Sequence, residues 1–161
     1  MEKASYCKKW SRWEKKPIQP WDAVKAGRAH KNGKLYTVLM GEPQKPTCFL
    51  EVRLEVGFVG VSFLDDNLRE YLCYNFKNIE DGKMFLTMAT HREYVGDSDD
   101  VCGATLYYFK PNGEVITEVA NLLDNTTKEA KQILDVSRNW EPVPAFGSYE
   151  GITRKERIKH S

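Results

Sequence analysis

The sequence predicts an α+β fold: a single domain with a strongly bent antiparallel sheet of about six or seven strands, a short N-terminal helix and one helix near residues 126–138. Three observations lead to this prediction. Apolar and polar residues alternate through most of residues 35–120, which is typical of half-buried strands. Turn dipeptides that contain glycine separate the alternating runs. After residue 125 the spacing of apolar residues changes to that of a helix.

Residues 1–34 form a basic arm that is rich in tryptophan. Pro17 and Pro20 prevent a long helix there, because proline removes a backbone donor. A short helix is expected over Trp21–His30, because Asp22 lies near its start and basic residues lie toward its end, as the helix dipole prefers. The tryptophans carry too much apolar surface to stay in water, so the arm should pack on the body or on a partner.

Residues 35–125 form an acidic body that should consist mostly of strands. The clearest strand is Leu50–Val56, in which apolar residues alternate with charged ones. Asp81-Gly82 and Asn112-Gly113 have the composition of hairpin turns, which require residues with positive φ. The other expected strands are Leu35–Met40, Val59–Phe63, Glu70–Phe76, Met84–Thr90, Thr105–Phe109 and Glu114–Val119.

Residues 126–161 complete the domain. Thr126 and Glu129 have the spacing of a capping box, in which a hydroxyl and a carboxylate satisfy free backbone N–H groups at the start of a helix. Ala130 and Ile133 then begin an apolar stripe of helical spacing. Beyond the helix, two prolines and three aromatic residues predict an extended segment that lies across the sheet.

The composition is that of one ordinary globular domain. The chain has 161 residues, of which 41% are hydrophobic and 12% aromatic, enough to build a core. No apolar run approaches the roughly 20 residues that span a bilayer. The N-terminus lacks the apolar stretch of a signal peptide. We therefore expect a cytoplasmic protein without a membrane partner.

The net charge is divided between the three segments. Residues 1–34 carry ten Lys and Arg against three Asp and Glu, whereas residues 35–125 carry seven against fifteen and residues 126–161 seven against five. The arm is therefore strongly basic and the body strongly acidic. An acidic body suits a basic partner, because complementary fields speed encounter and exclude wrong partners.

Several acidic residues should lie on loops. The densest cluster, at residues 96–100, lacks the ligand spacing and the distal Glu of an EF-hand, so calcium binding is not indicated. We predict that the acidic loops bind a cationic protein. The predicted partner-binding residues are Asp97, Asp99, Asp100, Asp65, Asp66, Glu80 and Asp81.

No motif indicates catalysis or a cofactor. The chain has no Walker loop, no dinucleotide-binding glycine pattern and no nucleophile elbow. His91 follows a strand close to Glu93 and is interpreted as a surface residue at a strand end. The four cysteines lie far apart without a C-x-x-C pair, so free thiols are expected rather than a zinc site. We expect no catalytic residues, no metal and no cofactor.

Five stretches of the chain form a recognisable pattern: Glu70–Phe76, Asp81-Gly82, Lys83–Tyr94, Tyr107–Val115 and Trp140–Gly147. This pattern resembles that of bacterial immunity proteins, the small cytosolic antidotes to polymorphic toxins of contact-dependent inhibition and type VI secretion systems. The resemblance covers about residues 48–150. It implies stoichiometric occlusion of a toxin's active site, by a protein that is not an enzyme. The toxin would be basic and could act on nucleic acid or nucleotides.

Two other functions stay open from the sequence. The basic arm interleaves lysines with tryptophans, as an adaptor for nucleic acid or another anionic partner would. The sequence pI of about 7.6 argues against nucleic acid as the partner, and the arm could instead fold back on the acidic body. The second alternative is a small enzyme that reverses a toxin's modification in a cavity of the curved sheet, with His91 and Glu93 as its first candidates.

Overall fold

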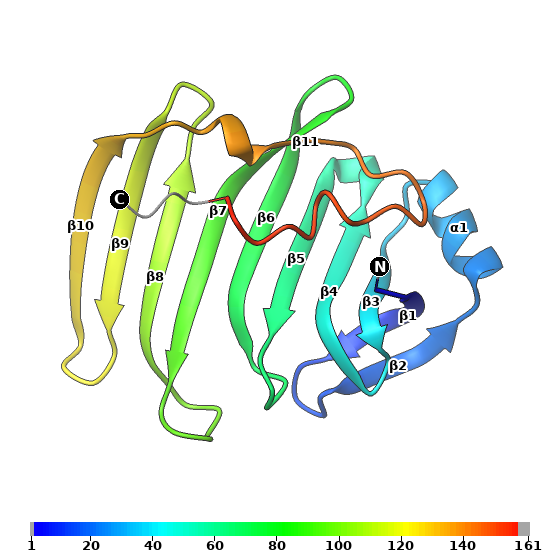
Figure 1. Ribbon diagram of the computed structural model, residues 1–161, viewed down its shortest axis with the longest axis horizontal. Coiled ribbons are helices and arrows are strands. Elements are labelled where there is room, and N and C mark those ends of the chain that lie inside the picture. Colours follow the sequence, from blue (N-terminus) through cyan, green and yellow to red (C-terminus); the bar gives the residue numbers. More distant parts are fainter. Residues whose placement is uncertain (1, 158–161) are drawn as a thin grey trace.

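Alternating apolar residues and tight turns fold the chain into one antiparallel sheet (Figure 1). The computed structural model describes residues 2–157, and within this range the sheet has eleven strands. Ten of them lie in the order β10-β9-β8-β7-β6-β5-β4-β3-β1-β2, and β11 pairs with β7. The strands are β1 (Ala4–Ser11), β2 (Lys16–Trp21), β3 (Tyr36–Glu42), β4 (Lys45–Arg53), β5 (Phe58–Leu64), β6 (Glu70–Glu80), β7 (Lys83–Tyr94), β8 (Val101–Phe109), β9 (Glu114–Asn121), β10 (Thr126–Ile133) and β11 (Trp140–Pro142).

This architecture shows that the α+β prediction was wrong, because the described chain is largely all-β. The strands expected in the acidic body are present as β3 to β9, except that the strand expected over Leu50–Val56 ends at Arg53. Leu54–Val56 is a short 3₁₀ helix, η1, which ends at Gly57 with a φ of 63°. Within the described residues, eleven strands replace the expected six or seven. The additional strands are β1 and β2 in the basic arm, β10 in the segment expected as a helix, and β11 in the tail. β2 and β10 are the outer strands of the sheet and β11 has three residues, so these strands lack the regular apolar alternation of a half-buried strand. β1 is paired on both sides, but the adjacent Lys8 and Lys9 interrupt its alternation.

The helix expected near residues 126–138 is also wrong, because Thr126–Ile133 is an edge strand paired with β9 along its whole length. The hydroxyl and the backbone N–H of Thr126 both donate to the carboxylate of Asp124. Asn125 adopts a φ of 57°, which reverses the chain. These contacts build a hairpin turn instead of a capping box, and every residue of β10 is exposed, so no apolar stripe is buried.

The expected N-terminal helix is present as α1 (Ala23–Lys31). Asp22 caps it by accepting a hydrogen bond from the backbone N–H of Lys25 at 2.8 Å, and three basic side chains occupy its last turn. The fully buried Ala26 marks the side of the helix that packs on the sheet. No helix in residues 2–157 is long and apolar enough to cross a membrane.

One face of the sheet is covered by the segment that follows β10, which crosses in front of the strands in Figure 1. Tyr149 of this segment is buried, and its hydroxyl lies 3.1 Å from that of Tyr36 on β3. Glu141 accepts hydrogen bonds of 2.7 Å from both Arg154 and Arg157. The Arg157 side chain is fully buried, so an ion pair inside the fold joins the end of the segment to β11, which pairs with β7.

On the opposite face, side chains of β1 pack against those of β3, β4 and β5. Trp10 is 1% exposed and stacks on Phe49 with ring centroids 5.8 Å apart. Leu39 and Leu64 complete this small apolar cluster together with Cys7. The basic arm is therefore part of the folded domain. The ring of Trp10 packs on the body, whereas Trp13 stays exposed, so the expectation that all the tryptophans of the arm pack away from water is wrong for Trp13.

Candidate functional site

The antiparallel order of the strands brings five of the seven predicted partner-binding residues to one end of the sheet. The loop 65–69 joins β5 to β6 and the loop 95–100 joins β7 to β8, and both lie at the lower edge in Figure 1. Together they contain five Asp and one Arg. Glu80 and Asp81 lie at the β6–β7 turn, at the upper edge, and are separated from the other five.

Arg69 ties the two acidic loops together. Its Nε donates to the carboxylate of Asp65 at 2.9 Å, and its Nη1 donates to the carbonyl oxygens of Gly96 and Ser98, each at 2.8 Å. Partial burial opposes the ionisation of Asp65, but hydrogen bonds from Arg69 and from the backbone of Asn67 outweigh it and lower the pKa of Asp65. This carboxylate therefore holds the loops in place.

The turn between β1 and β2 places residues of the basic arm at the same end. Nζ of Lys15 lies 2.8 Å from the carboxylate of Asp99. Arg12 donates to Glu51 at 2.7 Å and to Glu70 at 3.0 Å. The arm thus folds back on the acidic body, and part of its positive charge is paired within the domain.

Trp13 stands at the tip of this turn with 93% of its surface exposed. A groove of about 330 Å³ runs between the turn and the two acidic loops. The exposed carboxylates around it belong to loop 65–69 and loop 95–100, and Asp99 keeps 65% of its side chain exposed despite its ion pair. We call the turn 12–15 together with these two loops the acidic end. The groove is lined by Trp10, Arg12, Trp13, Lys15, Leu68, Arg69, Glu70, Tyr94 and Asp99.

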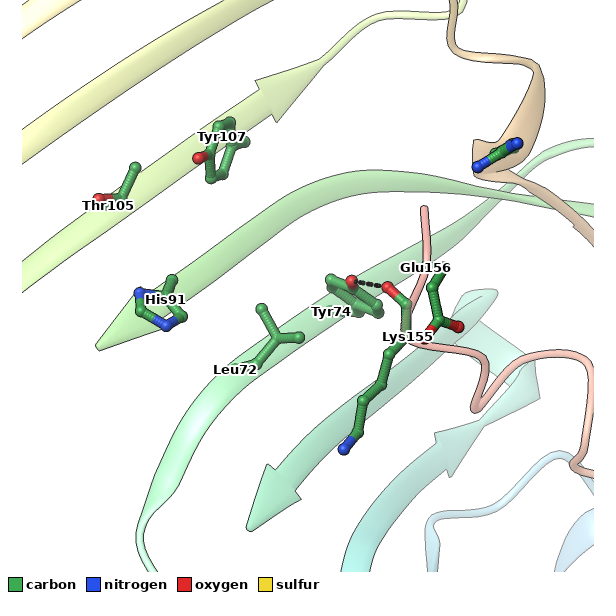
Figure 2. Close-up of a pocket in the computed structure, with 8 residues that line it drawn as sticks. Leu72, Tyr74, His91, Thr105, Tyr107, Lys155 and Glu156 are labelled. Carbon is green, nitrogen blue, oxygen red and sulfur yellow. Dashed lines mark hydrogen bonds between the residues drawn. The ribbon is translucent and has the colours of Figure 1, made fainter. Parts of the chain in front are cut away.

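A second pocket, of about 490 Å³, lies on the face that the C-terminal segment crosses (Figure 2). The hydroxyl of Tyr74 donates to the carbonyl oxygen of Lys155, and His91 stands apart from this hydrogen bond in Figure 2. Nζ of Lys155 lies over the ring of Tyr71 at 5.5 Å. The pocket is lined by Leu72, Tyr74, His91, Thr105, Tyr107, Arg138, Lys155 and Glu156.

The lining of this second pocket shows no acid–base pair around His91. Glu93 does not line it, and within residues 2–157 no hydrogen bond or ion pair joins Glu93 to His91. A general base requires such contacts, or contacts to a substrate, to abstract a proton. The second pocket is therefore a cavity with charged residues of both signs in its lining but without an arrangement for proton transfer. The acidic end is the better-defined candidate site.

Metal-ligating residues do not gather in the described part of the chain. No group of three or more His, Cys, Asp or Glu side chains in residues 2–157 could hold a metal ion. All four cysteines lie in this range and are free, as the sequence predicted. Burial raises the pKa of Cys7 to about 11, so its thiol stays protonated and unreactive at neutral pH.

Two residues of the acidic end were not found from the sequence. Trp13 was assigned, with Trp10, to a basic arm that could contact an anionic partner, and nothing in its neighbours distinguishes it from the buried Trp10. Arg69 follows Asp65 by four residues within a turn, and this spacing of opposite charges was the available signal. The comparisons add no further residue, because no family model, no curated protein and no solved structure matches the chain.

Proposed function

We propose that the chain is an immunity protein that binds a cognate protein toxin stoichiometrically and occludes the toxin's active site with the acidic end. The observation that carries the proposal is the position of Trp13 beside exposed carboxylates. Trp13 and Asp99 line the same groove, and Asp97 and Asp100 lie on the same loop as Asp99. An antidote of this kind would act in the cytoplasm of the cell that makes it.

Charge supports a basic partner. Loops 65–69 and 95–100 carry five Asp against one Arg. A toxin that acts on nucleic acid or nucleotides needs a cationic cleft for phosphate groups. Carboxylates fixed on the two loops present the opposite charge to such a cleft, which speeds association and favours one orientation of the complex.

Trp13 supports a protein surface as the binding target. Exposed Trp side chains are enriched among the residues that dominate the affinity of protein interfaces. Burying most of a Trp side chain, on the order of 200 Å², contributes about 5 kcal/mol from the removal of apolar surface from water. At 93% exposure, nearly all of this surface remains available for a partner.

Hydrogen bonds and an ion pair within the single chain hold the loops of the acidic end together. Arg69 fixes the loop 95–100 through two backbone carbonyl groups, and the ion pair between Lys15 and Asp99 ties the β1–β2 turn to that loop. Loops that are ordered in advance lose little conformational entropy on binding. A preorganised surface of this kind supports tight, stoichiometric inhibition.

The experiment mixes the purified chain with the toxin encoded beside it and combines titration calorimetry with an assay of toxin activity. We expect one-to-one binding with a Kd below about 10 nM, which corresponds to about −11 kcal/mol. Toxin activity should disappear at one molar equivalent. The proposal fails if a folded, active toxin does not bind, or if it binds and keeps its full activity.

A further inference from the structure

The two outer strands of the sheet differ in their capacity to accept another strand. β2 carries Pro17 and Pro20 within six residues, and proline cannot donate a backbone hydrogen bond. β10 contains no proline, and all eight of its residues are exposed. An open strand edge presents unpaired N–H and C=O groups to any strand that can pair with it. Within residues 2–157, β10 is therefore the edge at which the sheet can grow.

The hydrogen-bond pattern shows which residues of β10 face outward. The backbone N–H of Leu134 donates to the carbonyl oxygen of Gly113 at 2.9 Å. Hydrogen-bonded pairs alternate along an antiparallel ladder, so the even-numbered residues of β10 bond to β9. The backbone groups of the odd-numbered residues consequently point to the free edge. These residues are Thr127, Glu129, Lys131 and Ile133.

We propose that two copies of the chain associate through β10, paired antiparallel around a two-fold axis at Ala130. In this register Glu129 faces the partner's Lys131, and Lys131 faces the partner's Glu129. Thr127 faces the partner's Ile133, whose side chain is 73% exposed in the single chain. The four facing pairs are the odd-numbered residues, so each pair can also exchange two backbone hydrogen bonds.

Charge selects this register over its neighbours. The nearest registers that keep the two faces of the sheet continuous move the two-fold axis by one residue, to Glu129 or to Lys131. With the axis at Glu129, Glu129 would face the partner's Glu129. With the axis at Lys131, Lys131 would face the partner's Lys131. A shift by one position would place Lys128 opposite the partner's Lys131. Facing opposite charges stabilise a strand pair, whereas facing like charges destabilise it. The register centred on Ala130 has two opposite-charge pairs and no like-charge pair.

This association leaves the acidic end free. A two-fold axis perpendicular to the sheet reverses the direction of the strands, so the two acidic ends point away from each other. The inference does not depend on the identity of the toxin, and a failed toxin-binding experiment leaves it unchanged.

The test is sedimentation equilibrium of the full chain over a concentration series, with circular dichroism as a check on folding. For the wild type we expect a dimer with a dissociation constant on the order of 10 µM. Lys131→Glu turns both ion pairs into like-charge pairs and should weaken the dimer at least about tenfold. Glu129→Lys combined with Lys131→Glu restores opposite charges and should restore the dimer. Lys128→Glu makes the same charge change at a residue that faces the partner's Gln132, so it should leave the dimer nearly unchanged.

Two results would overturn the proposal. One is a monomer at every concentration up to about 500 µM, some fifty times the expected dissociation constant, in a chain whose circular dichroism shows a folded sheet. The other is a dimer that Lys131→Glu does not weaken, or that the double exchange does not restore.

Discussion

Arg69 and Asp65 form an ion pair of 2.9 Å that organises the acidic end from within. The guanidinium also holds two carbonyl groups of the loop 95–100 and lies over the ring of Tyr94 at 4.7 Å. One basic residue thus fixes loops that carry five Asp side chains between them. Positive charge inside the cluster relieves the repulsion between carboxylates and keeps the exposed ones in place.

The pKa of Asp65 leads to a prediction about acid stability. Because its pKa is lower in the folded chain than the unfolded value of about 3.9, Asp65 stabilises the fold above about pH 4, and this contribution is lost as the pH falls through the folded pKa. Asp65→Asn should lower the free energy of unfolding by about 1 kcal/mol at pH 7, measured by urea titration. The deficit should shrink as the pH approaches 3.

Asp66→Asn provides the matched control, because the Asp66 side chain is fully exposed and lies 3.9 Å from Lys45. An exposed pair of this kind contributes little to stability, so the control should stay close to the wild type at both pH values. A deficit for Asp65→Asn that does not change with pH would contradict the proposed role of its ionisation.

The ion pair between Glu141 and Arg157 should be important for stability. The Arg157 side chain is fully buried, and its burial lowers its pKa more than the nearby Glu141 raises it. Glu141 is the carboxylate that balances this buried positive charge. Arg157→Met should cost about 3 kcal/mol in a urea titration, because a buried carboxylate loses a charged partner. Arg154→Met removes the exposed second partner of Glu141 and should cost less than about 1 kcal/mol. An equal loss of unfolding free energy in the two variants would show that burial of the Arg157 side chain does not determine how much the ion pair stabilises the fold.

Substitutions of Trp10 and Trp13 should have different effects, the first on stability and the second on toxin binding. Trp10→Ala should lower the free energy of unfolding by about 3–5 kcal/mol, because the ring is buried against Phe49. Trp13→Ala should change that free energy by less than about 0.5 kcal/mol, because the side chain is exposed. The same variant should weaken toxin binding about 30-fold in calorimetry, as expected for a residue at the centre of an interface. Unchanged affinity would exclude Trp13 from the interface.

The strands of the body could be predicted from the sequence because apolar residues alternate with polar ones and glycine marks their turns. The face of the sheet on which each side chain lies was harder to predict from the sequence. Met84, Leu86 and Met88 have a regular spacing, but a bulge in β7 pairs Leu86 with Phe76 and Met88 with Asn75. The extra residue, Thr87, turns Met88 to the opposite face, and no local pattern signals this change.

The candidate site and the structure of β10 depended on contacts between residues that are far apart in the sequence or on backbone pairing, which local patterns do not show. Lys15 and Asp99 are 84 positions apart, and only the folded hairpin of β1 and β2 brings them together. The segment of β10 has weak apolar spacing in either period, so the hydrogen bonds of its turn and its pairing with β9 decided its structure. The loops 65–69 and 95–100 could be recognised as acidic, but their shared end follows from the topology of the sheet.

Charge reversal at the acidic end tests the central claim most directly. The variant combines Asp97→Lys, Asp99→Lys and Asp100→Lys, and its control combines Glu80→Lys and Asp81→Lys at the opposite end of the sheet. Both should keep the thermal midpoint of the wild type within a few degrees, which circular dichroism measures. We predict that the first variant weakens toxin binding at least about 100-fold in calorimetry and that the control changes it less than about threefold. Equal affinities for the two variants, or a larger loss in the control, would contradict the assignment of the acidic end as the binding surface.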